Sequence, residues 1–402
     1  MKHFSLLLFL LFPLLNWAQT TQYPLWEELA IPIDTTAAGY DWSALGAAIG
    51  DKELVFLGEF THGAKELFAV RNDLIAYLNR EKGFQVVLFE AGFGEMATIY
   101  SQRDSLSPAA MTQGFFGVWR TPEFVELMDY ISQNWMEFAG FDIQRSGRNF
   151  EALLQPYLEE KGQTHFLDIE QRFEAMERAL KKKSTPIDSV AHASQVLMAD
   201  YDALNRELGF PRDRLEAAIF KTLENRKEYI RYQSEFLQDQ DWSKRWAARD
   251  LAMAQNLRWL VENIYPGLKI IVVGHNFHLA RYNEREEVMG EFLDQYYSDK
   301  TYILGNFAAS GSYADNYGRE KTMEPVSPDG DDIKQYIEAL QGPLNFVPIP
   351  EEKSNPSSSF WNSLIVNDTF IDLYGGNRMV LGKHFDGLLL FKKVTSSAPQ
   401  GH

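Results

Sequence analysis

Short apolar runs alternate with longer helical patterns along most of the chain. The runs LVFL, VVLF, IIVV, YIL and LLLF cover residues 54–57, 86–89, 270–273, 302–304 and 388–391. Runs of this length without polar alternation are typical of strands buried on both faces of a parallel sheet. Residues 64–82 instead place apolar side chains at helical spacing, and Gly83 follows as a helix terminator. The pattern predicts an α/β fold with a largely parallel or mixed central sheet flanked by helices.

The pattern changes between about residues 150 and 265, where charged and apolar positions repeat at helical spacing. The segment LEAAIFKTLENRKEYIRYQSEFL is an example, and it carries few strand signals. We interpret residues 150–265 as a helical insertion that forms one wall of the active-site cleft. Residues 19–149 and 266–393 would then form the two parts of the α/β core, and residues 394–402 a tail.

The first 18 residues, MKHFSLLLFLLFPLLNWA, have the pattern of a secretory signal peptide. A basic start precedes a short apolar stretch, and Ala18 is a small residue at the expected cleavage position. A permanent anchor is the alternative, but Pro13 and the shortness of the stretch oppose a stable spanning helix. We therefore expect a periplasmic or secreted protein that keeps no stable membrane anchor once the leader is removed.

Composition excludes several classes of function. The chain has 39 Lys and Arg against 56 Asp and Glu, and its net charge of −17 would repel phosphate backbones, so no nucleic-acid partner is expected. It has no cysteine, which removes disulfides, thiolate metal ligands and thiol nucleophiles. Aromatic residues make up 14% of the sequence, enough to line a cleft for a small-molecule substrate.

Ionisable residues stand at the ends of three predicted strands. Glu59 ends LVFLGE, Glu90 ends VVLFE and His275 ends IIVVGH. In open α/β sheets, ligands bind outside the carboxyl ends of parallel strands, so these three side chains would meet in one crevice. A single residue of this kind is more often a helix cap or a solvated ion pair. Three of them on separate strands favour a functional site.

Three further residues extend this candidate site. His62 lies in the turn after Glu59, and His278 follows His275 by three residues. Arg71, about two and a half helical turns after His62, is within reach of the same crevice or of a carboxylate. The chain has no G-x-S-x-G nucleophile motif, no H-E-x-x-H zinc motif and no Gly-rich phosphate loop. The remaining chemistry is activation of water by a histidine that carboxylates orient.

The same residues carry a resemblance to a known family. GEFTHG, the following Arg71, VLFEA, GFDIQ and GHNFH occur in the order in which the erythromycin esterase family has its motifs. RDLAMAQNLRWL at residues 249–260 also resembles the family pattern, and the similarity spans roughly residues 54–307. Two departures are visible: Glu90-Ala91-Gly92-Phe93 lacks an acidic residue that the family often has there, and the last third matches loosely. These departures concern the substrate more than the chemistry.

The resemblance implies an α/β sheet with a helical appendage and a deep cleft between them. It implies ester hydrolysis by water, with no covalent intermediate and no obligatory metal or cofactor. The best-known members cleave the macrolactone of macrolide antibiotics, which links one branch to antibiotic resistance. Carried over by motif, the general base is His62, and the site is completed by Glu59, Glu90, Arg71, His275 and His278.

Two other functions stay open at this point. The first is a metal-dependent hydrolase or peptidase, because Glu59, His62, Glu90 and His275 are all competent ligands of a divalent ion. The second is a non-catalytic haem-binding envelope protein, because a histidine-bearing aromatic cleft suits haem. Sensitivity to chelators tests the first alternative, and haem titration tests the second.

Overall fold

The computed structural model describes residues 26–36, 39–182, 186–284, 286–325, 332–350, 365–368 and 377–398. The predicted signal peptide, residues 1–18, lies outside these ranges, as do residues 399–402 of the predicted tail. None of the helices in the described ranges combines the length and the apolar character of a membrane-spanning segment.

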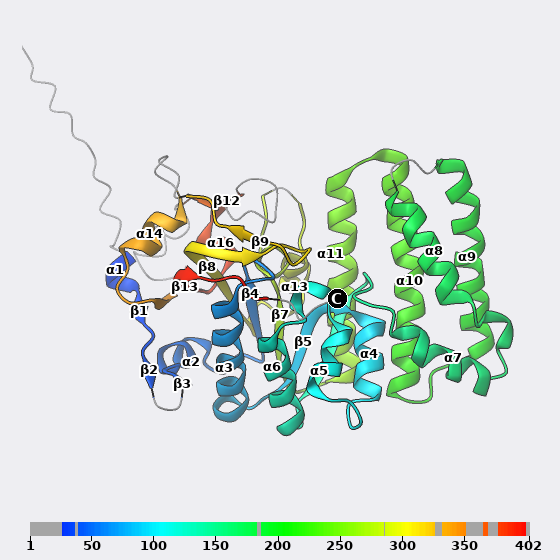
Figure 1. Ribbon diagram of the computed structural model, residues 1–402, viewed down its shortest axis with the longest axis horizontal. Coiled ribbons are helices and arrows are strands. Elements are labelled where there is room, and N and C mark those ends of the chain that lie inside the picture. Colours follow the sequence, from blue (N-terminus) through cyan, green and yellow to red (C-terminus); the bar gives the residue numbers. More distant parts are fainter. Residues whose placement is uncertain are drawn as a thin grey trace, which may run out of the picture.

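The described chain is built around a nine-stranded sheet. Figure 1 shows helices packed around this sheet. Its strands are β1 (Ile31–Pro32), β4 (Leu54–Glu59), β5 (Phe84–Gly92), β6 (Glu137–Asp142), β7 (Lys269–His275), β8 (Thr301–Ala314), β9 (Glu320–Thr322), β10 (Leu344–Pro348) and β13 (Gly387–Val394). The order across the sheet is β1-β10-β13-β8-β4-β7-β5-β6, and β9 pairs with β8. Two small ribbons pair β2 (Thr35–Thr36) with β3 (Gly39–Tyr40) and β11 (Ile365–Asp368) with β12 (Asn377–Val380). All five predicted strands are present in the central sheet.

The sheet is parallel from β13 to β6, and its antiparallel pairs lie on the β10 and β1 side and at β9. Strand β4 lies between β7 and β8, and β7 lies between β4 and β5, with every one of these pairs parallel. Strands β10, β1 and β9 join their neighbours in antiparallel fashion, so the sheet is mixed. The predicted α/β fold class is confirmed. Because β4, β7 and β5 are parallel neighbours, their carboxyl ends lie at one edge of the sheet.

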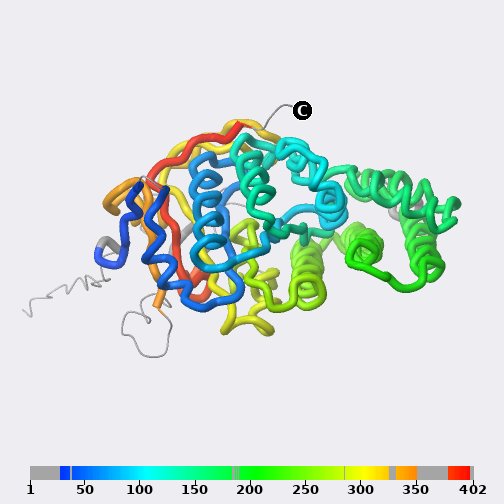
Figure 2. Tube along the Cα trace, turned by 90° about the horizontal axis from the view of Figure 1, so that it is seen from below, coloured from blue at the N-terminus to red at the C-terminus, as the bar shows by residue number. Residues whose placement is uncertain are grey.

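Helices cover both faces of this sheet. They are α1 (Trp26–Leu29), α2 (Ser43–Ile49), α3 (Lys65–Lys82), α4 (Phe93–Ser101), α5 (Pro108–Met111), α6 (Pro122–Gln133), α7 (Phe150–Glu160), α8 (Ile169–Lys181), α9 (Ile187–Leu208), α10 (Arg214–Asp239), α11 (Trp242–Trp259), α12 (Asn276–Leu279), α13 (Met289–Tyr297), α14 (Ile333–Ala339) and α16 (Leu381–His384). Short 3₁₀ turns are η1 (Thr112–Gly114), η2 (Gly117–Trp119) and η3 (Thr164–Phe166), and η4 (Leu260–Ile264) is a π-helix. In Figure 2, α3 and α6 lie on one side of the sheet and α11 and α13 on the other.

Helices α7 to α10 form a separate helical unit beside the β6 edge of the sheet (Figures 1 and 2). They surround an apolar cluster of their own, distinct from the larger cluster around the sheet. Helix α11 belongs to both regions, because Ala252 packs into the helical cluster while Met253 and Leu257 pack into the sheet core. The helical region between residues 150 and 265 therefore reaches the strand ends through α11.

Helix α3 follows the sequence pattern closely. It begins after Ala64, and Leu67, Leu74 and Leu78 are buried on its inner face. It ends at Gly83, whose φ of 74° is left-handed and whose N–H donates to the Leu78 carbonyl. Glycine adopts this conformation without the steric cost that a Cβ would bring.

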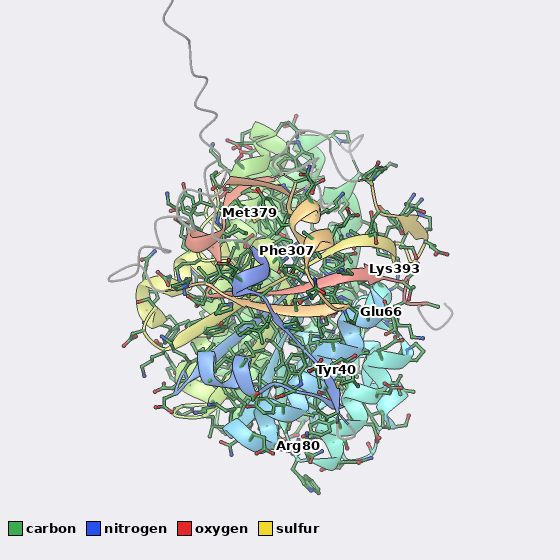
Figure 3. The ribbon with its side chains drawn as sticks, turned by 90° about the vertical axis from the view of Figure 1, so that its left-hand side faces the viewer. Tyr40, Glu66, Arg80, Phe307, Met379 and Lys393 are labelled. Carbon is green, nitrogen blue, oxygen red and sulfur yellow. The ribbon has the colours of Figure 1, made fainter. Side chains whose placement is uncertain are left out.

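The predicted tail starts too early. Val394 is the last residue of β13, and the Thr395 N–H donates to the Glu66 carboxylate of α3 at 2.6 Å. Figure 3 shows Glu66 beside Lys393 at this end of the strand. The prediction missed these contacts because two serines and a threonine after β13 have the composition of a solvated loop, although their backbone groups pair with distant segments.

The turn that carries His62 is fixed by two distant segments. The Gly63 carbonyl accepts N–H bonds from Ala314 at the end of β8 and from Ser397, each at 2.9 Å. A Cβ on Gly63 would lie 2.2 Å from the Ala314 carbonyl oxygen, so this close approach requires glycine. The backbone next to His62 is thus held from both sides.

Candidate active site

A cavity of about 340 Å³ lies at the carboxyl ends of β4, β5 and β7. It is lined by His62, Glu90, Phe116, Val118, Trp119, Gln144, Trp246, Arg249, His275, His278 and Asn316. Four of the six predicted site residues are in this lining. The other two, Glu59 and Arg71, lie behind His62. The register of the sheet explains the convergence, because Glu59 of β4 pairs directly with His275 of β7.

Arg71, Glu59 and His62 form a chain of contacts that ends at the cavity. The Arg71 Nη1 donates to Glu59 Oε2 at 2.6 Å, and Glu59 Oε1 lies 2.5 Å from Nδ1 of His62. Glu59 is fully buried, whereas the His62 side chain is 18% exposed. The guanidinium of Arg71 lies 4.9 Å from the ring centres of Phe68 and Phe124. Arg71 therefore fixes the Glu59 carboxylate, and the carboxylate fixes the imidazole.

Glu90 is the centre of a second buried cluster. Its Oε2 accepts the backbone N–H of His275 at 2.8 Å, and its Oε1 accepts from Arg249 at 3.0 Å. The same guanidinium donates to both carboxylate oxygens of Asp142, at 3.2 and 2.6 Å. Burial alone would raise the pKa of Glu90, but the positive charges of His278 and Arg249 outweigh it and lower the pKa to about 2. Glu90 is thus a fixed negative charge on the cavity wall.

Backbone groups occupy both ring nitrogens of His275. Its Nε2 donates to the Phe60 carbonyl at 3.1 Å, and its Nδ1 accepts the Phe277 N–H at 3.2 Å, which caps helix α12. Burial lowers the pKa of His275 to about 3, and the neighbouring charge of His62 acts in the same direction. His275 is therefore a neutral ring held by the backbone, and it supports the cavity without taking up a proton.

His278 faces the cavity from helix α12. Its Nδ1 donates to Asp250 at 2.7 Å, while its Nε2 lies 3.1 Å from Arg249 Nη1 and 3.5 Å from Glu90 Oε1. Burial alone would lower the pKa of His278, but the carboxylates of Asp250 and Glu90 outweigh it and raise the pKa. In its neutral form the ring accepts from Arg249, and in its protonated form it donates to Glu90. The charge of His278 thus depends on its protonation, whereas the neighbouring Arg249 is always positively charged.

Aromatic side chains pack around His62 on the cavity wall. The edge of Trp119 packs against His62 with ring centres 5.3 Å apart, and the Trp119 ring is stacked on Phe124. His62 also packs edge-on against His275 at 5.2 Å. Helix α11 contributes Trp246 to the lining. A substrate entering this cavity would therefore meet apolar rings as well as charged groups.

Three buried residues of the site were missed by the sequence reasoning. These are Arg249, Asp142 and Asp250, and each makes contact with a predicted residue or with another member of the set. The signal was present in motifs that were used only for the resemblance, since GFDIQ contains Asp142 and RDLAMAQN begins with Arg249 and Asp250. Their roles depend on long-range contacts, such as Arg249 to Glu90, which periodicity does not reveal.

The donor groups of the site are largely engaged by protein partners. In the ranges that the structure describes, no group of three or more His, Asp and Glu side chains is placed to hold a metal ion. A cation bound between Glu59 and His275 would have to displace the contacts of Glu59 with Arg71 and His62 and those of His275 with the backbone. The arrangement presents an imidazole backed by a buried carboxylate, which suits proton transfer from water.

Comparison with known proteins agrees with this class of site. Residues 80–394 match the family model described as erythromycin esterase, a range that begins after the turn carrying His62. A Bacillus subtilis (strain 168) protein named "Putative hydrolase YbfO" is 27% identical over 418 residues, which cover 92% of this chain and 90% of that protein. "Erythromycin esterase type II" of Escherichia coli is 25% identical over 272 residues, covering 60% of this chain and 64% of that protein.

A solved structure shares the fold. A mutant of the erythromycin esterase EreC in its open conformation superimposes with a TM-score of 0.62 at 16% identity, covering 92% of this chain and 98% of that one. The fold and the relatives together define a hydrolase with a mixed α/β sheet. The chain belongs to the erythromycin esterase family.

Proposed function

We propose that this hydrolase cleaves a carboxylic ester with a water molecule that His62 deprotonates. The observation that carries the proposal is the Arg71, Glu59 and His62 chain, which places one imidazole at the cavity wall with a buried carboxylate behind it. Glu59 contacts Nδ1, so proton transfer uses Nε2 on the other side of the ring. The buried carboxylate stabilises the imidazolium that forms when the proton is taken.

The remaining steps use groups on the same wall. The hydroxide attacks the ester carbonyl and forms a tetrahedral intermediate with a negatively charged oxygen. The guanidinium of Arg249 and the ring of His278 lie 3.1 Å apart and supply positive charge for this oxygen. When the intermediate collapses, the bond to the alcohol oxygen breaks and the imidazolium returns its proton to that oxygen. The products are a carboxylic acid and an alcohol, and no covalent enzyme intermediate forms.

We further propose macrocyclic lactones as a class of substrate. A lactone is an internal ester, and its hydrolysis needs the same groups. The relative from Escherichia coli is named an erythromycin esterase, which supports including macrolides in the assay. The aromatic part of the lining, with Phe116, Trp119 and Trp246, suits a substrate with an apolar body.

The test is replacement of His62 by asparagine. The His62→Asn side chain keeps a hydrogen-bond donor for Glu59 but has no basic nitrogen, so kcat should fall by about 10² to 10⁴-fold. Binding of the substrate should change little, and the melting temperature should stay close to that of the wild type. The assay is hydrolysis of macrolides and of simple activated esters by the purified protein.

A matched control removes a histidine outside the site. His165 is 58% exposed, and its nearest carboxylate, Glu207, lies at 3.4 Å on the surface of the helical unit. The His165→Asn variant should keep the full rate. A His62→Asn variant that melts normally and hydrolyses any good substrate at the wild-type rate would overturn the assignment of His62 as general base.

A further inference from the structure

A second pocket, of about 270 Å³, lies where the helical unit meets the core. One wall is the start of α10 with Arg214, Leu215 and Ala218, and the other walls come from α4, β6 and the end of α11. Trp246 and Trp259 are thirteen positions apart on α11, so the pocket lies about 20 Å along that helix from the active-site cavity. The two cavities are separate sites on one helix.

Aromatic rings dominate this pocket. The rings of Phe93, Tyr100, Phe138, Trp259 and Tyr265 line it. The pocket is open to solvent at its rim, so these rings expose apolar surface that a ligand can bury. The rim carries the exposed Leu215, and it gives a ligand a way in.

The helix that closes the pocket is irregular at this point. Helix α11 passes into the π-helix η4, in which the Tyr265 N–H donates to the Leu260 carbonyl, five residues earlier, at 2.9 Å. Both Leu260 and Ile264 of this wide turn line the pocket. Single π-turns in helices are frequently found at functional sites. This irregular turn, at the end of the helix, is therefore a second feature of the pocket, independent of its volume, that is typical of a functional site.

Two arginines are the charged members of the lining. Arg214 is already paired, since its guanidinium lies 2.7 Å from the Glu137 carboxylate. Arg103 differs, because its ion-pair partner in the described chain is Asp104, which is 3.9 Å away and 79% exposed. The guanidinium of Arg103 lies 4.0 Å from the centre of the Tyr100 ring, and its Nη1 donates to the Tyr100 carbonyl at 3.1 Å. Stacking on the ring and this single bond leave the other N–H groups of the guanidinium able to pair with an anion.

We propose that this pocket binds a small apolar carboxylate, with its hydrocarbon or aryl body among the five rings and its carboxylate against Arg103. The apolar lining selects the body of the ligand by burial of its surface. The one weakly paired cation at the rim selects an acid over a neutral molecule of the same shape. The site is independent of the proposed ester hydrolysis, because the two cavities share none of their lining residues.

The probes are 4-phenylbutanoate and its neutral amide, titrated into the purified protein by calorimetry. The acid should bind saturably at one site, and at least tenfold more tightly than the amide. Arg103→Gln should weaken the acid about tenfold, the loss expected for one charge-assisted pair, and leave the amide unchanged. Saturable binding of the acid that Arg103→Gln does not weaken would overturn the proposal, as would equal affinity of the wild type for acid and amide.

A cavity-filling variant locates the bound molecule. Ala97 lines the pocket from α4, so Ala97→Trp should weaken both probes at least tenfold. The matched control is Ala193→Trp on the exposed side of α9, which should bind as the wild type does. Wild-type affinity in a folded Ala97→Trp variant, or the absence of saturable binding to the wild type, would overturn the site. If Ala97→Trp does not fold, the Arg103→Gln comparison decides alone.

Discussion

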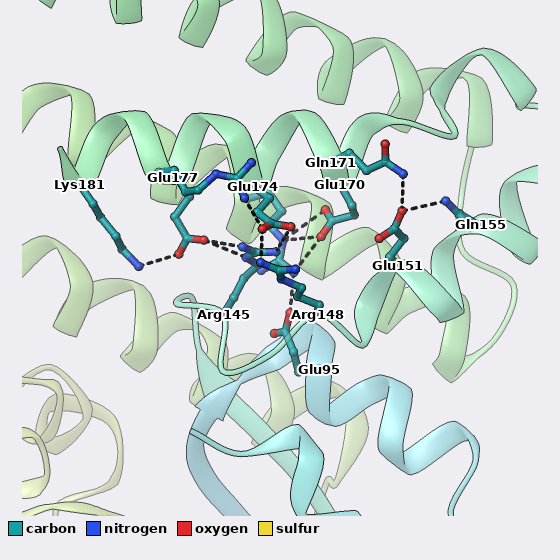
Figure 4. A network of polar contacts seen from close by, with 12 residues as sticks. Glu95, Arg145, Arg148, Glu151, Gln155, Glu170, Gln171, Glu174, Glu177 and Lys181 are labelled. Atoms are coloured by element: carbon teal, nitrogen blue, oxygen red, sulfur yellow. Dashed lines mark hydrogen bonds and ion pairs between the residues drawn. The ribbon is translucent and has the colours of Figure 1, made fainter. Parts of the chain in front are cut away.

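Two buried arginines hold similar partners in different surroundings. Arg249 lies between Glu90 and Asp142 at the active-site cavity, and Arg226 lies between Glu95 and Glu170 where the helical unit meets the core. Figure 4 shows Glu95 and Glu170 of the second cluster with further acidic and basic residues around them.

The Arg226 cluster and the Arg249 cluster differ in what packs around them. The guanidinium of Arg226 lies over the rings of Phe150 and Phe173, and the cluster is closed off by helices α4, α8 and α10. The guanidinium of Arg249 faces His278 and lines a cavity. A buried arginine between two carboxylates is thus not by itself the mark of an active site. The Arg249 cluster differs from the Arg226 cluster because it contacts an imidazole and borders a cavity that water can enter.

The pKa values of Glu90 and Glu95 are shifted in opposite directions. Both oxygens of Glu90 accept hydrogen bonds, and its pKa is lowered to about 2. In Glu95, Oε1 bonds to Arg226, whereas Oε2 has no hydrogen-bond partner in the described chain. Burial raises the pKa of Glu95, and the nearby charge of Glu170 adds to this against the attraction of Arg226. The first carboxylate is stabilised as an anion and the second is not.

The largest expected effect comes from removing each arginine in turn. Arg249→Met and Arg226→Met should each lower the free energy of unfolding by about 3 to 5 kcal/mol, because each leaves buried carboxylates without their partner. Only Arg249→Met should lower kcat per folded molecule, by about 10²-fold, since in the proposed mechanism its charge stabilises the oxygen of the intermediate. Denaturant unfolding and ester hydrolysis, normalised to the folded fraction, measure the two quantities.

Lysine variants serve as controls for these changes. Arg249→Lys and Arg226→Lys keep a positive charge but lose the planar guanidinium. They should therefore lower the free energy of unfolding less than the methionine variants do. A loss of kcat in Arg226→Met as large as that in Arg249→Met would show that the two clusters do not differ in the way we infer.

The next effect concerns stability against acid. A lowered pKa in the folded state means that ionised Glu90 stabilises the fold above its ordinary pKa of 4.5, and that this stability is lost as pH falls toward about 2. At pH 7, Glu90→Gln should therefore lower the free energy of unfolding by up to about 3 kcal/mol. Glu95→Gln should leave it unchanged or raise it, because folding disfavours the charge that this variant removes. Melting curves of both variants between pH 3 and pH 8 test the contrast, and equal losses would contradict it.

A smaller effect is expected in the pH dependence of the rate. Glu59→Gln removes the negative charge beside His62, and an imidazolium without that neighbour gives up its proton more readily. The acidic limb of the kcat profile should move to lower pH by about one unit. The control is Glu66→Gln, which changes a carboxylate seven residues further along the chain that bonds to Thr395 instead. An unmoved limb in Glu59→Gln would mean that Glu59 serves only to hold the turn.

The smallest expected effect is that of a chelator. If imidazole activates water, incubation with a chelator should leave the rate of ester hydrolysis within about twofold of the untreated protein, because no metal-bound water takes part in the proposed mechanism. Loss of activity that added manganese or zinc restores would favour the metal-dependent alternative.

The sequence predicted the centre of the fold well and its margins poorly. The five predicted strands are apolar on both faces, a pattern that a buried parallel strand needs. Strand β6 has Glu137 and Gly140 within six residues, and β1 and β9 have exposed edge positions, so none of them shows such a run. Strand β8 was recognised at residues 302–304 but extends to Ala314 through small and polar residues.

The site was predicted where local sequence positions the side chain. Glu59, Glu90 and His275 end strands, and the sheet register brings them together. Arg249 was missed because it comes from a helix whose approach to the strand ends depends on the packing of the whole helical unit. Contacts such as Arg249 to Asp142 join positions 107 residues apart, and no local pattern specifies them.

The closure of the His62 turn by Ser397 also sets the order in which the site forms during synthesis. Gly63, next to the proposed base, receives the Ser397 N–H, and β13 enters the middle of the sheet only after most of the chain has been made. A growing chain that already contains Glu59, Glu90 and His275 still lacks the support of the turn. The newborn protein therefore gains this support of its site only after the residues that follow β13 have left the ribosome.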